Sequence, residues 1–132
     1  MERILPRLRM PLARLLCTTL CCILLAMTAR AQDAFITTWK TSTADESITI
    51  PIKPDLAGYN YSVDWGDGST STSQTGNATH NYAAAGIYTV TISGDFPAIQ
   101  FGSAASADVN DQKLITVEQW GDQVWQSMHQ AF

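Results

Sequence analysis

Acidic and hydroxyl side chains crowd into one short stretch of the chain. Residues 61–70 read YSVDWGDGST, in which Asp64, Asp67 and Ser69 bring oxygen atoms together after an apolar segment. Oxygen ligands at alternating positions are typical of calcium loops, and two carboxylates could divide acid and base catalysis between them. The same residues could also form a tight turn, because Asp-Gly pairs close β-hairpins and aspartates accept hydrogen bonds from turn amides.

The surrounding residues favour the turn. An EF-hand calcium loop continues with further acids and ends in a glutamate, whereas Ser, Thr, Gln, Gly, Asn and Ala dominate after Ser69. A glycosidase pair faces across a cleft, but Asp64 and Asp67 lie on one turn. His80 and His129 are too far apart in sequence to suggest a zinc site. We therefore expect no enzyme activity and no cofactor, with Asp64, Asp67 and Ser69 as weak calcium candidates.

The elements around the turn are predicted to be strands. Apolar and polar residues alternate in three segments, so one face of each is expected in a core: Ile48, Ile50 and Ile52; Tyr59, Tyr61, Val63 and Trp65; Tyr88, Val90 and Ile92. Weaker signals indicate strands in AFITTWK, ATHNY and PAIQF, and turns in KPDLAG, GDGS and AAAG. Short strands without a helical period between them predict an antiparallel β-sandwich. The tyrosine and tryptophan row could alternatively be a sugar-binding platform, although its alternation favours a core face.

The same stretch, YSVDWGDGS, followed by THNYAAAGIYTVTISG, resembles the PKD (polycystic kidney disease type) domain. The resemblance places that family's strand, turn and aromatic motif on a set of residues in this chain: Asp64, Trp65, Gly66, Asp67, Gly68, His80, Tyr82, Gly86, Tyr88 and Val90. Val63 stands where the family usually has Trp, and Trp65 where it has Phe, so core packing is expected to differ in detail. The resemblance covers residues 34–94 and implies an all-β, immunoglobulin-like antiparallel sandwich.

The N-terminal residues are typical of a secretory signal peptide. Residues 1–14 contain four arginines and one acid, an apolar run LLCTTLCCILLAM follows, and Ala29-Arg30-Ala31 supplies small residues at the cleavage spacing. The run is shorter than the roughly 20 residues that span a bilayer, which argues against an uncleaved anchor. We therefore predict a secreted or cell-surface protein that loses residues 1–31, and with them all three cysteines.

The remaining chain is small and acidic. Residues 32–132 hold three lysines against eleven Asp and Glu, a net charge of −8. Such a surface repels phosphate backbones, so we expect neither nucleic acid nor an anionic membrane as a partner. The length suffices for one small domain with a single core.

The C-terminal residues carry a different pattern. The polar stretch GSAASADVNDQK, residues 102–113, is typical of a linker. In LITVEQWGDQVWQSMHQAF a short strand precedes apolar residues at helical spacing, which predicts an amphipathic helix with one apolar stripe for interaction: Trp120, Val124, Trp125, Met128 and Phe132.

That segment is similar to the opening of BspA-type leucine-rich repeats in bacterial surface proteins, where a strand, a QWG step and a Trp-x-x-Met-x-x-Ala-Phe helix form one unit. A single repeat cannot bury its apolar face, so the resemblance implies following repeats of a longer chain. Without them, residues 114–132 are expected to self-associate or to be poorly ordered, and their removal to leave the sandwich intact.

Four segments are thus expected: a signal peptide (1–31), a PKD-like sandwich (32–101), a linker (102–113) and a partial leucine-rich repeat (114–132). The expected function is that of a non-catalytic module of a bacterial surface protein, which mediates adhesion or contacts protein or polysaccharide. The alternative is an accessory domain, binding carbohydrate or substrate, in a secreted hydrolase or protease. A fold does not fix a ligand, so the sequence names no partner more closely.

Overall fold

Seven strands make up the fold in the computed structural model, which describes residues 32–101 and 110–132. Their bounds are β1 Phe35–Thr41, β2 Glu46–Ile50, β3 Asn60–Asp64, β4 Thr70–Gln74, β5 Ala78–Tyr82, β6 Gly86–Asp95 and β7 Leu114–Gln119. A short 3₁₀ helix, η2 (Asp111–Lys113), precedes β7. The predicted signal peptide and residues 102–109 of the predicted linker lie outside the described residues.

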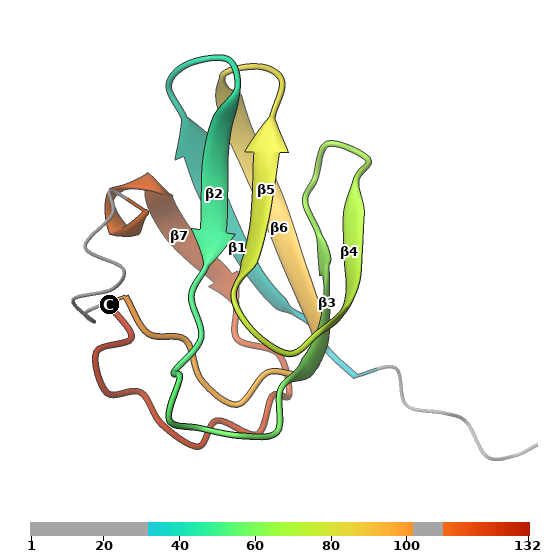
Figure 1. Cartoon of the computed structure of the whole chain (residues 1–132), viewed down its shortest axis with the longest axis vertical. Helices are drawn as coiled ribbons and strands as arrows, with labels where there is room; N and C mark the ends of the chain where they lie inside the picture. Colours follow the sequence, from blue (N-terminus) through green and yellow to red (C-terminus); the bar gives the residue numbers. More distant parts are fainter. Residues whose placement is uncertain (1–31, 102–109) are drawn as a thin grey trace, which may run out of the picture. The chain divides into compact units, whose positions relative to one another are not determined.

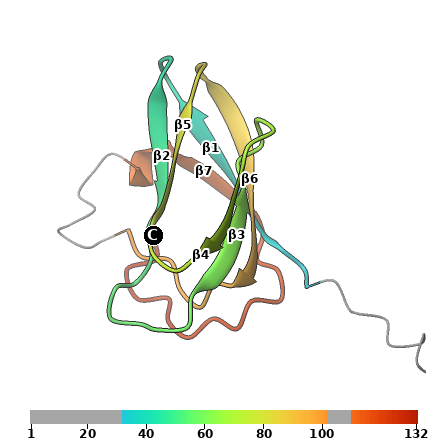
Figure 2. The same ribbon diagram turned by 45° about the vertical axis from the view of Figure 1, so that its right-hand side comes forward.

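The strands form two antiparallel sheets that face each other (Figures 1 and 2). The larger sheet has the spatial order β4-β3-β6-β1-β7, and the smaller one pairs β2 with β5. In the larger sheet β6 pairs with β1 on one side and with β3 on the other, from Asn60↔Asp95 to Asp64↔Thr91. This confirms the predicted all-β antiparallel sandwich.

The core lies between the sheets and contains most of the alternating residues predicted for it, with Ile52 and Tyr88 only partly buried against it. Along β1, Phe35, Thr37, Trp39 and Thr41 are buried while their neighbours are more exposed. The row of Tyr59, Tyr61, Val63 and Trp65 is buried throughout, so these side chains form a core face and the sugar-platform interpretation is wrong. Each large apolar side chain buried in this way contributes roughly 1.5–3 kcal/mol to folding.

One strand was missed by the sequence patterns, and one predicted strand is absent. The edge strand β4 was not predicted, because TSTSQ has no apolar residue to mark a buried face, and its irregularity at Ser73 (φ +55°) breaks the strand period. PAIQF was predicted to be a strand, but residues 96–101 are irregular although all are buried. Pro97 interrupts any ladder there because it has no backbone N–H.

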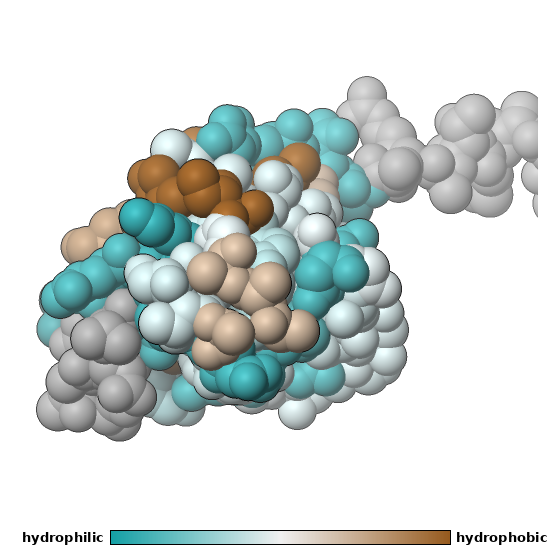
Figure 3. Space-filling model, turned by 90° about the horizontal axis from the view of Figure 1, so that it is seen from above, coloured by the Kyte–Doolittle hydropathy of each residue, from teal (hydrophilic) through white to brown (hydrophobic). Residues whose placement is uncertain are grey.

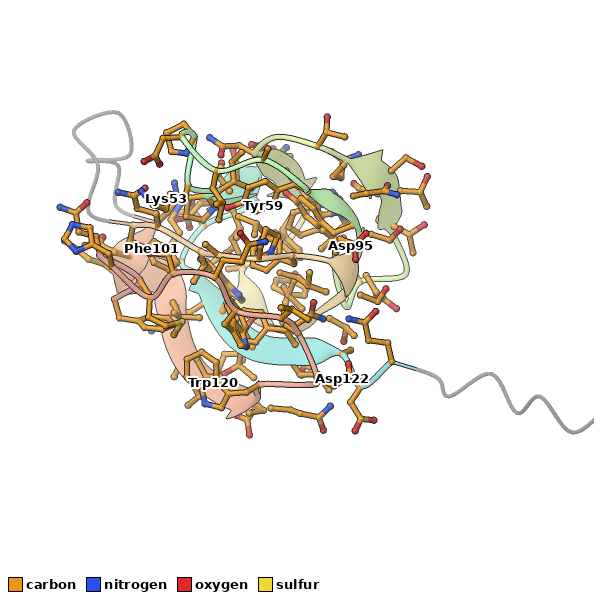
Figure 4. The ribbon with its side chains drawn as sticks, turned by 90° about the horizontal axis from the view of Figure 1, so that it is seen from below. Lys53, Tyr59, Asp95, Phe101, Trp120 and Asp122 are labelled. Atoms are coloured by element: carbon orange, nitrogen blue, oxygen red, sulfur yellow. The ribbon has the colours of Figure 1, made fainter. Side chains whose placement is uncertain are left out.

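The predicted C-terminal helix is also wrong. The strand of that segment is present as β7, which joins the sandwich by pairing with β1, but residues 120–132 form no helix. Figure 4, seen from below, shows the chain running from Trp120 past Asp122 and then back toward Phe101. This segment, here called the tail (residues 120–132), therefore packs across the lower end of the sandwich.

Backbone hydrogen bonds explain why the tail is extended. The Asp122 N–H donates to the Asp33 carbonyl at 3.1 Å, and the Gln126 N–H donates to the Pro97 carbonyl at 2.8 Å. The Phe101 N–H in turn donates to the Gln130 carbonyl at 2.9 Å. These bonds use backbone groups that a helix would pair within itself.

Within residues 32–101 and 110–132, no helix has the length and apolar character needed to cross a membrane.

Candidate functional site

The GDG turn between β3 and β4 is held by its own aspartates. Asp64 Oδ1 accepts a hydrogen bond from the Gly66 N–H at 2.9 Å, and Asp67 Oδ1 accepts one from the Ser69 N–H at 2.9 Å. The Trp65 N–H donates to the Ser69 carbonyl at 3.0 Å, closing the loop. Gly66 and Gly68 have φ of +76° and +91°, a conformation that favours glycine.

A buried aromatic layer lies directly under this turn. Trp65 is fully buried, its indole N–H donates to Ser71 Oγ at 2.9 Å, and its carbonyl accepts a hydrogen bond from the Tyr82 hydroxyl at 2.8 Å. The His80 ring stacks on Trp65 with ring centroids 5.1 Å apart. His80 Nε2 lies 2.7 Å from Asp67 Oδ2, which fastens the turn to β5.

The rest of the predicted motif continues this layer toward β6. Tyr88 stacks on Tyr82 with ring centroids 3.9 Å apart, and its hydroxyl donates to the Ala84 carbonyl at 2.8 Å. The Gly86 N–H donates to Thr41 Oγ1 at 3.0 Å, which ties the start of β6 to the end of β1. The structure thus connects several of the predicted motif residues, namely Asp67, His80, Trp65, Tyr82 and Tyr88, through hydrogen bonds and ring contacts.

The family model for the PKD domain matches residues 28–95, just over half of the chain. The chain belongs to the PKD domain family. Neither the curated proteins nor the solved structures that were searched gave a match. The matched PKD region ends at the last residue of β6, so β7 and the tail lie beyond it although they pack on the same core.

Electrostatics also assigns the PKD turn a structural role. The hydrogen bond with His80 is the main cause that holds the pKa of Asp67 below its usual value. A carboxyl that acts as a general acid near neutral pH needs the opposite shift, which an apolar pocket would provide. Tyr82 does have a pKa raised above its usual range by burial, but its hydroxyl is committed to the Trp65 carbonyl.

Two of the weak calcium candidates, Asp64 and Asp67, use side-chain oxygens within the PKD turn. Asp64 and Asp67 each cap a backbone N–H, and the second oxygen of Asp67 pairs with His80. Among residues 32–101 and 110–132, no three His, Cys, Asp or Glu side chains come together in a group that could hold a metal ion. Tight calcium sites use six to eight oxygen ligands, several of them charged.

We therefore expect the melting temperature of residues 32–132 to be the same in millimolar calcium and in a chelator, because a ligand raises it only by binding the native state. Differential scanning calorimetry would check this, with Asp67→Asn as the matched variant that removes one charge from the turn. A clear rise in calcium that is lost in Asp67→Asn would contradict the structural interpretation of the turn.

The residues predicted to form an interaction stripe divide into two groups. Trp125 is half-buried and packs edge-on against Phe35 and Phe96, at centroid distances of 5.0 and 6.1 Å, so it covers the core. Trp120, Met128 and Phe132 keep 44%, 46% and 63% of their surface exposed.

Seen from above, at the end opposite the tail, the molecule is mostly hydrophilic or neutral, with hydrophobic side chains gathered toward one side (Figure 3).

Sequence reasoning missed a polar clamp beside η2. Lys113 Nζ lies 3.0 Å from Glu46 Oε1 and donates to the Ser47 carbonyl at 2.7 Å, while Asn110 Oδ1 accepts from the Thr49 N–H at 3.2 Å. The pKa of Glu46 is lowered to about 2, mainly by the hydrogen bond from the Ser42 N–H. The clamp fixes the end of the predicted linker to β2, and no local sequence signal links these distant residues.

Proposed function

We propose that this PKD domain is a non-catalytic interaction module of a secreted or cell-surface bacterial protein, which mediates adhesion or contacts protein or polysaccharide. Membership of the PKD family carries the proposal, because PKD domains are typically extracellular adhesion or interaction modules. The acidic surface of residues 32–132 agrees with this role, since its net charge of −8 favours solubility and disfavours nucleic acid.

The uses of the motif residues support a non-catalytic role. The two carboxylates most suited to chemistry, Asp64 and Asp67, hold the turn, and Asp67 has a lowered pKa. The aromatic row that would favour an accessory carbohydrate-binding domain is buried in the core. The carbohydrate-binding form of the alternative, an accessory domain of a hydrolase or protease, therefore lacks the support of an exposed aromatic row.

Two features of the sequence extend the proposal. Residues 1–31 have the pattern of a signal peptide, which supports export, and residues 114–132 resemble the start of a leucine-rich repeat, which supports a longer chain. Because the tail is extended and packs on the sandwich, following repeats would meet its exposed side chains, among them Met128 and Phe132, rather than a helix stripe.

Surface labelling tests the proposal. An antibody raised against residues 32–132 should label intact cells that produce the protein, and should detect a chain larger than 14.4 kDa after denaturing electrophoresis. Soluble residues 32–132 should also reduce attachment of those cells in a dose-dependent way, whereas the same protein after irreversible heat denaturation should not. Labelling that requires cell lysis would contradict the proposal.

A further inference from the structure

The outer edge of β7 is unpaired in the part of the chain that the structure describes. β7 lies at one end of the five-stranded sheet and, within the described residues, pairs only with β1. Its sequence LITVEQ is rich in β-branched residues, has one charge and lacks Pro and Gly. At the other end of the sheet, β4 is entirely polar and irregular. Open edges with strong β propensity pair readily with another chain; the register of β7 against β1 shifts at two points, but β7 lacks the lysine and proline that usually protect an edge.

An apolar groove follows this edge. It has a volume of about 410 Å³ and is lined by Phe101, Asp111, Phe132 and the four consecutive residues 114–117. The groove follows β7, because four consecutive residues of that strand line it. Ile115 and Phe132 remain 48% and 63% exposed there, which leaves apolar surface beside unpaired backbone.

We propose that β7 is a docking edge for an extended segment of a different polypeptide, which adds as a further strand and inserts an apolar side chain into the groove. In this mode the main chain of the added strand supplies affinity, and side-chain pockets supply selectivity. The inference rests on the proposed function as an interaction module, and it names the surface and the kind of partner.

Charge indicates which strand fits. The acidic residues at the groove and along the strand are Asp111 and Glu118, both exposed, while the Lys113 ammonium is engaged by Glu46 and the Ser47 carbonyl. A segment with basic residues beside its apolar ones therefore complements the edge. A second copy of this chain complements it less well, because two surfaces of net charge −8 would meet.

A short synthetic peptide of alternating valine and threonine, with a lysine at each end, is the probe. Titrated into residues 32–132, which contain the whole described core, it should shift backbone amide resonances of β7 and leave those of β4 unchanged. Methylating alternate peptide nitrogens should weaken binding by about tenfold or more, since it removes strand hydrogen bonds. Replacing both lysines by glutamate should also weaken it.

Matched variants locate the site. Ile115→Lys, which places a positive charge in the groove, should abolish binding of the lysine peptide, whereas Ile87→Lys, which changes an exposed isoleucine on β6, should leave it unchanged. Circular dichroism would establish that both variants fold. No binding by the wild type, or equal binding by Ile115→Lys, would overturn the inference.

Two further outcomes would give the edge another occupant. Concentration-dependent dimerisation with protection of β7 amides would assign the edge to a second copy. In a monomer, β7 amides protected from hydrogen exchange as strongly as those of β1 would show that the chain covers its own edge. Surface labelling of cells without peptide binding would overturn the docking edge and leave the proposed function in place.

Discussion

Replacing Trp125 by alanine should lower the free energy of unfolding by about 2 to 4 kcal/mol, because it removes the aromatic cover from Phe35 and Phe96. Both of those rings are fully buried in the core, and Trp125 is the tail residue that contacts both. The neighbouring change Val124→Ala is the matched control. Val124 is 78% exposed, so this change should alter the free energy of unfolding by less than about 0.5 kcal/mol. Urea denaturation monitored by far-ultraviolet circular dichroism, a signal of the backbone, would measure the free energy of unfolding of both variants.

The same packing reverses an expectation from sequence, namely that residues 114–132 could be removed without harm. Deleting residues 120–132 should destabilise the domain at least as much as Trp125→Ala, because Ala131 is also buried and three backbone hydrogen bonds fix the tail. Gly121→Ala, which keeps every other side chain of the tail, offers a second test and should also destabilise the domain. Gly121 has φ +66°, and a Cβ there would come under 3.0 Å from the Asp33 carbonyl oxygen. A stable domain after the deletion would show that the tail is an appendage.

The sequence predicted those parts of the fold that depend on local pattern. Strands with alternating apolar residues, such as Tyr59 to Trp65, were found because burial of one face imposes a period of two. The GDG turn was found because two aspartates and two glycines specify it locally. The contact between Asp67 and His80 was not predicted, because a contact between a turn and β5 leaves no local signal; the PKD resemblance named both residues without pairing them.

The parts that were missed depend on contacts between distant residues. Helical spacing in the tail records only where apolar residues recur, whereas in the structure Trp125 packs on Phe35 and Phe96 from an extended segment and Met128 and Phe132 stay exposed. That path is set by the approach of Gly121 to Asp33, which no pattern within the tail contains. Likewise, the ion pair between Lys113 and Glu46 joins residues that lie far apart in the sequence.

The two glycines of the PKD turn should respond very differently to the same substitution. Gly66 and Gly68 both have positive φ, so alanine at either position should cost about 1 to 2 kcal/mol in backbone strain. A Cβ at Gly68 would meet nothing within 4 Å, whereas a Cβ at Gly66 would come under 3.0 Å from the Thr89 carbonyl oxygen.

Thr89 cannot easily move away, because β6 is paired with β1 at Thr38↔Thr89 and with β3 a short distance along the strand. We therefore expect Gly66→Ala to lower the free energy of unfolding by about 3 to 5 kcal/mol, which includes the strain and the displacement of β6. Gly68→Ala should lower it only by the strain. Chemical denaturation of the two variants side by side would measure the difference between their free energies of unfolding. That difference reports the cost of a Cβ at the close approach of the turn to β6. Equal destabilisation by the two alanines would mean that the turn does not pack against β6 in solution, and the network from Asp67 through His80 to Tyr82 would then lose its support.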